Sequence, residues 1–430
     1  MIHTMTIQHK MDGRKARIWM RDMGYTEDEA EAFMQYKMYK ENGLPRQYIN
    51  SKVELSAGIS SVDLQIVRPD GKYYDDFYGY VRMEPLTVIT GEKHIALFEC
   101  SPENIKSLQD EFRAIMVRFL GLDGTNNLMN EFAEFSGWDA NRVDYTRDIR
   151  FRNHDEVLAF MNLCKLLTRE IGYNYAMTKT NTYGWNFTNE MYKFGNKTWE
   201  LEVYDKQAQV RNREHRYVEQ NDAEDVFQQL VEESQNVLRF EYRRKNPGTR
   251  KGSTGFDDKN IMQFLSEEVA DQWFHKAYGS CIGYEPFYVL DYQLMLKLAE
   301  AFPMSKQECQ RERGKKKRYD KACAQARKAG VALPKPYKKQ VMGRTAQQYY
   351  AFLSFVNKHK GLMNAEASFS DFEYANRPKF QTRIDNLRAK GIAPVCIPKN
   401  WLYIRPNGNG RAMDLPHDFL PNPIARPEND

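Results

Sequence analysis

The sequence predicts an α+β fold, in which a largely antiparallel sheet carries helices on one face, followed by a helical C-terminal region with a winged helix-turn-helix-like end. Segments with strand-like alternation come in groups with amphipathic helical stretches between them, an order typical of antiparallel sheets. Beyond residue 252 the pattern becomes mostly helical. With 430 residues and 41% apolar composition, the chain is long enough for two or three folded domains.

The first half of the chain alternates between helical and strand-like segments. Residues 1–50 are predicted to be a helical extension, because Thr26 and Glu29 form a capping-box pattern before Ala30 and Phe33. Residues 51–252 are predicted to be the α+β domain. Its expected elements are several strands between 51 and 100, a helix that begins at Pro102, a strand over 141–151, a helix near 154–171, strands near 178–188 and 198–205, a helix over 222–235 and a strand over 237–245.

The second half is predicted to hold a helical connector over 253–304, a basic segment over 305–344, a DNA-binding unit over 345–410 and a tail over 411–430. In the DNA-binding unit, Phe380, Ile384 and Leu387 form one apolar stripe of a helix that Gly391 ends. Two short strands are expected after it, which gives the pattern of a winged helix-turn-helix. A small helical bundle with a β tail fits the same pattern.

Composition and motifs exclude several classes of protein. No apolar run approaches the roughly 20 residues that span a bilayer, and the N-terminus lacks the apolar core of a secretion signal. We therefore expect a cytoplasmic protein without a membrane partner. The six cysteines form no CxxC pair, and the sequence contains neither a phosphate-binding GxxxxGK[ST] loop nor an HExxH zinc motif.

Positive charge is concentrated between Lys306 and Arg344, where nine lysines and five arginines face three acidic residues, a local excess of 11. Such a stretch attracts nucleic acid, because each phosphate contact releases counterions. Lys315, Lys316, Lys317 and Arg318 are the predicted DNA-binding residues of this segment. A solvated helix or linker is the alternative explanation for the same charge.

Two predicted strands carry carboxylates among apolar residues. Alternate residues of a strand share a face, so Arg142, Asp144 and Asp148 point to one side. On the strand over 237–245, Arg239, Glu241 and Arg243 likewise share a side. The arginines of these two strands, Arg142, Arg239 and Arg243, are predicted to bind DNA. Buried carboxylates either pair with cations or bind a metal ion, and both explanations remain open here.

A divalent ion such as Mg²⁺ or Mn²⁺, held by carboxylate oxygens, would polarise a phosphate for in-line displacement. A tyrosine that attacks the phosphorus would keep the bond energy of a broken DNA strand in a covalent ester. Tyr204 is the first candidate, because it lies on the same side of its strand as Glu200 and Glu202 and close to Lys206. Tyr242, next to Glu241, is the second candidate.

Segments from about Phe98 to Lys245 resemble the gene II/X family of replication initiators, the rolling-circle initiation endonucleases of filamentous phages and related plasmids. The resemblance rests on four short motifs that occur in the same order at similar separations. These are the segment that begins Phe98-Glu-Cys-Ser-Pro, the strand with Arg142-Val-Asp144, the Val203-Tyr-Asp-Lys206 segment and the strand from Leu238 to Lys245. The chain lacks the His-hydrophobic-His metal motif of the wider superfamily.

The resemblance implies a site-specific nickase and strand-transferase that links Tyr204 to a 5′ phosphate. It implies that Asp144 and Glu241 serve the metal ion, with Glu99 and Asp148 as additions, and that Tyr242 is a rival nucleophile. The helix from Lys379 to Lys390 resembles the terminal helix-turn-helix of some members, which makes Lys379, Arg383 and Arg388 candidate DNA-binding residues.

The implied partners are single-stranded and duplex origin DNA in a bacterial host cell, with a host helicase and polymerase as further candidates. Two other functions fit the same sequence. One is a non-catalytic, sequence-specific DNA-binding regulator whose carboxylates are locked in ion pairs, and the other is a metal-dependent nuclease that uses water.

Overall fold

The computed structural model divides the chain into two compact units, residues 1–150 with 193–277, and residues 151–192 with 278–430. The structure describes residues 1–35, 40–41, 44–45, 48–67, 76–122, 127–167, 175–176, 191–195, 199–212, 214, 224–245, 259–375, 379–398, 402–404 and 410–427. None of the described helices is long and apolar enough to cross a membrane.

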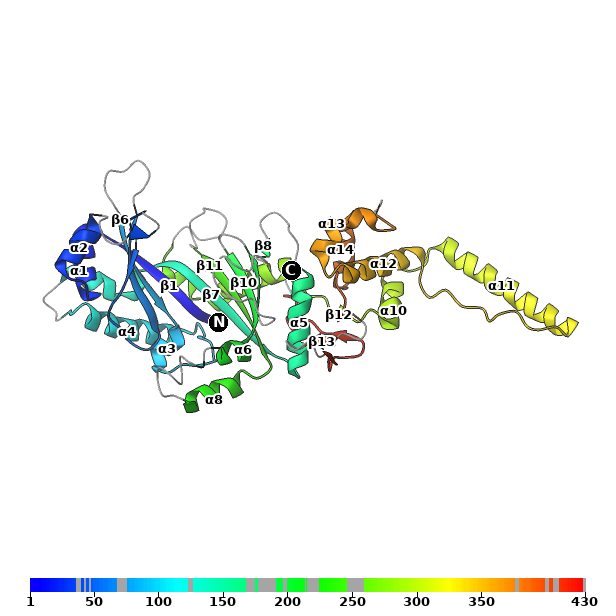
Figure 1. The fold of residues 1–430 in the computed structure, drawn as a ribbon, viewed down its shortest axis with the longest axis horizontal. Coiled ribbons are helices and arrows are strands. Elements are labelled where there is room, and N and C mark those ends of the chain that lie inside the picture. The colour runs from blue at the N-terminus through cyan, green and yellow to red at the C-terminus, as the bar shows by residue number, and fades with distance from the viewer. Residues whose placement is uncertain are drawn as a thin grey trace. The chain divides into compact units, whose positions relative to one another are not determined.

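The largest sheet has the strand order β4-β5-β6-β1-β7-β11-β10-β9-β8, and most of its strands belong to the first unit. Figure 1 shows the central strands β1, β7, β11 and β10 side by side, and each of these neighbouring pairs is antiparallel. The strands are β1 (Ile2–Met11), β4 (Tyr48–Asn50), β5 (Ile59–Val67), β6 (Asp76–Met83), β7 (Asp139–Arg150), β8 (Tyr175–Ala176), β9 (Met191–Gly195), β10 (Trp199–Asp205) and β11 (Val237–Lys245). A separate short pair joins β2 (Lys40–Glu41) to β3 (Leu44–Pro45). The prediction of a largely antiparallel sheet is confirmed.

The prediction of a helical N-terminal extension is wrong for the first residues, because Ile2–Met11 form β1 in the middle of the sheet. Ile2 and Met5 are fully buried although they are three residues apart. A β-bulge between Ile2 and Thr4 causes this spacing, since the extra residue shifts the alternation by one. The predicted helix that Thr26 caps is present as α2 (Glu27–Met34), with both bonds of the capping box formed.

Helices contact several strands of this sheet. The first unit contains α1 (Gly13–Asp22), α3 (Pro85–Thr90), α4 (Pro102–Phe119), α6 (Lys206–Arg211), α8 (Glu224–Glu233) and most of α9 (Glu267–Cys281). Trp273 of α9 packs against Tyr145 of β7 and Tyr242 of β11, and Phe274 packs against Phe240. These rings make one side of the central strands apolar.

The second unit is mainly helical, as predicted for the C-terminal region. It contains α5 (His154–Leu166), α10 (Tyr292–Ala301), α11 (Lys306–Ala329), α12 (Arg344–Lys358), α13 (Leu362–Ala367) and α14 (Phe380–Arg388). Two short strand pairs accompany them, β12 (Phe287–Tyr288) with β15 (Phe419–Leu420), and β13 (Leu402–Ile404) with β14 (Gly410–Ala412). The winged helix-turn-helix itself stays a prediction.

The basic segment forms a helical arm, α11 together with the chain from residue 330 to 343. A capping box at Ser305 begins the helix, and Gly330 ends it in the left-handed conformation. The chain then runs back along the helix (Figure 1), where the hydroxyl of Tyr337 donates to Glu312 at 2.5 Å. Lys315, Lys316, Lys317 and Arg318 are all exposed on this arm.

Candidate functional site

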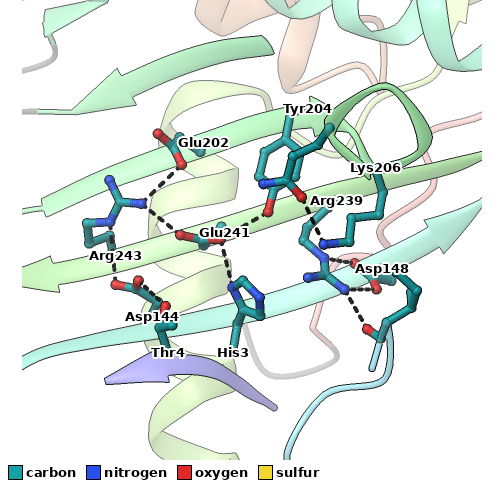
Figure 2. A network of polar contacts seen from close by, with 12 residues as sticks. His3, Thr4, Asp144, Asp148, Glu202, Tyr204, Lys206, Arg239, Glu241 and Arg243 are labelled. Atoms are coloured by element: carbon teal, nitrogen blue, oxygen red, sulfur yellow. Dashed lines mark hydrogen bonds and ion pairs between the residues drawn. The ribbon is translucent and has the colours of Figure 1, made fainter. Parts of the chain in front are cut away.

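Charged side chains gather on the side of the sheet opposite the rings of α9, which we call the polar face. Strand alternation places them there, because β7 and β11 pair in a register that sets Asp144 opposite Arg243 and Glu241 opposite Thr146. The β10 strand adds Tyr204 opposite Arg239 and Glu202 opposite Glu241. Figure 2 shows the resulting network, whose labelled members on these three strands are Asp144, Asp148, Glu202, Tyr204, Arg239, Glu241 and Arg243. The strand register places Thr146 and Glu200 on the same face.

Arg243 lies among four carboxylates. Its guanidinium is 2.9 Å from Glu200, 3.1 Å from Glu202, 2.8 Å from Glu241 and 3.5 Å from Asp144. Burial alone would lower the pKa of Arg243, but the surrounding carboxylates outweigh it and raise that pKa. The arginine is therefore a permanent cation at the point where the predicted metal-binding carboxylates converge.

Asp144 is fully buried, and protein donors surround its carboxylate. Thr4 of β1 donates its hydroxyl to Oδ2 at 2.6 Å, and Arg142 donates Nε to Oδ1 at 2.8 Å. A second nitrogen of Arg142 bonds to Oδ2, while Arg243 approaches Oδ1. This arrangement provides the pairing that a buried carboxylate requires.

Glu241 joins the network to the predicted nucleophile. The Tyr204 hydroxyl donates to Glu241 Oε2 at 3.1 Å, and His3 Nδ1 lies 3.3 Å from the same oxygen. Burial tends to raise the pKa of Glu241, but the hydrogen bond and charge of His3, with the charges of Arg243 and Arg142, hold that pKa well below its usual value. The carboxylate next to Tyr204 is therefore ionised at neutral pH.

His3 and Thr4 are site residues that the sequence alone did not reveal. The bulge in β1 lets two consecutive residues reach the polar face, where they contact Glu241 and Asp144 respectively. A histidine followed by a threonine near the N-terminus carries no recognisable chemical motif. The available signal was the apolar spacing of Ile2, Met5 and Ile7, all of which are fully buried.

Asp148 and Arg239 form a second, separate part of the network. Arg239 is fully buried and donates two hydrogen bonds of 2.6 Å to the carboxylate of Asp148. It also donates to the carbonyl oxygen of Ile95 at 2.7 Å. Ile95 packs with apolar residues of α6 and α8, so this corner of the polar face is covered and not open as predicted.

Replacing Arg239 with methionine should lower the free energy of unfolding by about 3 kcal/mol, because Asp148 loses both bonds of a bidentate pair while it stays mostly buried. Urea denaturation measures this. The exposed Lys316→Gln variant is the matched control and should leave the unfolding free energy unchanged. Equal stability of Arg239→Met and the wild type would show that the pair does not hold the sheet together.

The structure separates the two candidate tyrosines. Tyr204 is 1% exposed and lies on the polar face in contact with Glu241. Tyr242 lies on the opposite face, where its ring packs against Trp199 and Trp273. Because adjacent residues of a strand point to opposite faces, Tyr242 cannot share a reacting phosphorus with Glu241 in this fold. The structure therefore does not place Tyr242 with the carboxylates of the polar face, and its role as a rival nucleophile stays a prediction.

Two further predicted site residues lie at the margin of the network or outside it. Lys206, two residues after Tyr204, is buried at the start of α6. Its Nζ donates to the side-chain oxygen of Gln209 at 2.8 Å. Glu99 is exposed in the loop that precedes α4, after the bridge between Ile2 and Phe98. The structure does not bring Glu99 into the carboxylate cluster.

The carboxylates in this arrangement do not fit a bound divalent ion. Both oxygens of Asp144 and both oxygens of Glu241 already accept from protein donors. Among the described residues there is no group of three His, Cys, Asp or Glu side chains suited to a metal ion. The guanidinium of Arg243 supplies positive charge at this point, and the requirement for Mg²⁺ or Mn²⁺ stays a prediction.

The predicted DNA-binding residues near the C-terminus differ in exposure. Lys379 is exposed at the start of α14, and Arg388 is half-buried. Arg383 is fully buried, with its guanidinium over the rings of Tyr349, Phe352 and Phe372. It also donates to the carbonyl oxygen of Tyr374 at 2.6 Å. The prediction that Arg383 contacts DNA is therefore wrong, since this side chain holds the helical core together.

Comparison with known proteins identifies the part of the chain that carries this network. Residues 104–263 match the family described as the N-terminal region of the replication-associated gene II protein, which confirms the resemblance to the filamentous-phage gene II replication initiators. The matched range includes β7, β10 and β11, whereas β1 with His3 and Thr4 lies outside it. No curated protein and no solved structure matches the chain.

Proposed function

Because the chain matches the filamentous-phage gene II replication initiator family over the strands that form the polar face, we propose that it is a rolling-circle nickase and strand-transferase with Tyr204 as its nucleophile. One observation carries the proposal. The hydroxyl of Tyr204 donates to an ionised carboxylate, Glu241, inside a network that also holds Arg239 and Arg243. This hydrogen bond orients the phenol, and Glu241 is placed to take up its proton as the bond to phosphorus forms.

The proposed reaction is an in-line exchange at one phosphorus atom of the origin strand. A bond forms between Tyr204 Oη and phosphorus, the bond from phosphorus to the 3′ oxygen breaks, and the phenolic proton passes to Glu241. The 3′ oxygen takes up a proton and becomes the hydroxyl that a polymerase of the host extends. Rejoining is the reverse exchange, in which the 3′ hydroxyl of the displaced strand attacks the phosphotyrosine and releases Tyr204.

Access to Tyr204 requires a movement of the chain. Its side chain is 1% exposed, and α6 follows directly after the strand that carries it. This helix is short, and the carboxylate of Asp205 caps it by accepting from the backbone of Gln207 and Ala208. We infer that α6 covers the Tyr204 hydroxyl in the free protein. Binding of a phosphodiester displaces this helix and so exposes the hydroxyl.

The helical arm and the predicted DNA-binding unit over 345–410 are proposed to bind duplex DNA beside the nick. Replacing Lys315, Lys316, Lys317 and Arg318 with glutamine should weaken binding to all DNA sequences and flatten its salt dependence. Each lost phosphate contact should reduce the slope of log K against log salt by about 0.9. Filter binding at several salt concentrations measures the slope, with Lys297→Gln outside the arm as the control. An unchanged slope would show that the arm does not contact phosphates.

A regulator without catalytic activity is the second candidate function. Two observations favour it: the carboxylates are paired with arginines, and the Tyr204 hydroxyl is buried. In that case the network would only stabilise the sheet, and the arm would supply the affinity for DNA. The two functions differ in whether any phosphodiester bond is broken.

One experiment separates these functions. The full-length protein is incubated with single-stranded origin DNA, with and without Mg²⁺ or Mn²⁺, and the products are separated by denaturing electrophoresis. The proposed nickase gives a protein–DNA adduct and a free 3′ hydroxyl. Cleavage without an adduct would indicate a nuclease that uses water, and intact DNA under all conditions would indicate the regulator. The reactions without added metal also test whether cleavage depends on a divalent ion.

A further inference from the structure

Apart from Arg243 Nε, which lies 3.5 Å from Asp144, two buried polar atoms on the polar face have no hydrogen-bond partner among the described residues. They are the hydroxyl oxygen of Thr146 and the Nη1 nitrogen of Arg239. Thr146 is 1% exposed, and Arg239 is fully buried. A buried donor without an acceptor is costly, so two of them on one face need an explanation.

The sheet register places Arg239 next to the proposed nucleophile and Thr146 one strand further away, because β11 lies between β7 and β10. Thr146 is opposite Glu241 in the pairing of β7 with β11, and Arg239 is opposite Tyr204 in the pairing of β11 with β10. Thr146 and Arg239 are therefore diagonal neighbours on one face, with backbones separated by about 7 Å. One group with two acceptor oxygens that enters between these side chains accepts from each donor at about 2.9 Å.

The charge of Arg239 limits which group fits. Asp148 already holds two of its nitrogens and balances its positive charge, so the site offers hydrogen-bond donors without a large excess of positive charge. Glu241 next to it is ionised. A singly charged phosphodiester is therefore favoured over a doubly charged phosphate monoester, which would meet stronger repulsion.

We propose that Thr146 and Arg239 form a binding site for a phosphodiester group, whose two non-bridging oxygens accept hydrogen bonds from Thr146 Oγ1 and Arg239 Nη1. The site would hold the phosphorus atom next to the Tyr204 hydroxyl. Donors placed at the oxygens that gain charge in the transition state lower the barrier of such a displacement. The catalytic part of this inference rests on the proposed function, whereas the binding part does not.

The test uses Thr146→Val, which removes the hydroxyl and keeps the shape of the side chain. The matched control is Thr4→Val, because Thr4 donates its hydroxyl to Asp144 on the same face. We expect Thr4→Val to lower the urea midpoint of unfolding and Thr146→Val to leave it unchanged. Loss of stability in Thr146→Val similar to that in Thr4→Val would mean that Thr146 has an internal partner, such as a trapped water, and would overturn the proposal.

Binding is measured by the rise in melting temperature with dimethyl phosphate, a singly charged phosphodiester, against sodium chloride of equal ionic strength. The rise should occur in the wild type and in Lys297→Gln, which lies on α10 outside the arm, should be lost in Thr146→Val, and should return in Thr146→Ser. A rise that persists in Thr146→Val, or no rise in the wild type, would refute the site.

The adduct assay separates failure of the site from failure of the proposed function. Wild-type protein that forms no DNA adduct, but is stabilised by dimethyl phosphate through Thr146, would refute the nickase and keep the binding site. Wild-type adduct formation together with an unchanged rate in Thr146→Val would keep the nickase and refute the site. If both proposals hold, Thr146→Val should slow adduct formation by about 10-fold to 100-fold.

Discussion

The Tyr204→Phe variant is expected to form no DNA adduct, with a loss of at least about 10³-fold in the rate of nicking, because no other hydroxyl contacts Glu241 from the polar face among the described residues. The fold should persist, since the ring stays in place and the variant loses only the hydroxyl that donates to Glu241. Denaturing electrophoresis of the reaction with labelled single-stranded origin DNA measures the adduct.

Tyr242→Phe is the matched control for this variant. The side chain lies on the opposite face, against Trp199 and Trp273, so its hydroxyl should have no effect on adduct formation. An adduct that survives in Tyr204→Phe and disappears in Tyr242→Phe would show that β10 and β11 present different faces to the DNA in the reacting protein.

Glu241→Gln should slow adduct formation by about 10²-fold to 10⁴-fold, because glutamine still accepts a hydrogen bond from Tyr204 but cannot take its proton. It should also lower the free energy of unfolding by about 3 kcal/mol, since Arg243 and His3 lose a buried carboxylate. Single-turnover kinetics and urea denaturation measure the two effects. A variant that is destabilised but nicks at the wild-type rate would show that Glu241 is only structural.

The same carboxylate should also make stability depend on pH. The pKa of Glu241 lies well below its usual value of 4.5 in the folded protein, so folding favours its charged form. This contribution to stability is complete above about pH 4.5 and is lost as the pH falls through the lower, folded pKa. Unfolding free energies of the wild type should therefore decrease below about pH 4.5 more steeply than those of Glu241→Gln. Parallel curves would contradict the depressed pKa.

Much of the candidate site was predictable because strand alternation is a local property. The spacing of Asp144, Asp148, Glu241 and Arg243 placed them on common faces before any pairing was known. The same rule, applied to Glu241 and Tyr242, already sets these neighbours on opposite faces. The family resemblance nevertheless kept Tyr242 as a candidate, and in the structure its ring packs against Trp273 of α9.

Two other features were not predicted from the sequence. In one case a β-bulge interrupts the local alternation of a strand, and in the other a charged residue was expected to be exposed. The bulge in β1 interrupts the alternation, so a central strand resembled part of a charged helical segment. Arg383 lies three residues after Phe380 and four before Leu387, which places it on the apolar stripe of α14. Its charge suggested a surface role, whereas the surrounding rings of Tyr349, Phe352 and Phe372 bury it.

The sequence by itself determined the fold class and the strands that carry the acidic and basic residues, because periodicity and short motifs are encoded within single segments. It also led to the proposal of Tyr204 as the nucleophile. Only the tertiary structure decided that Arg243 occupies the centre of the carboxylates, that His3 and Thr4 complete the network, and that the side chain of Tyr204 is buried. These contacts join residues up to 238 positions apart. The order and register of the paired strands set such contacts, and no local pattern encodes them.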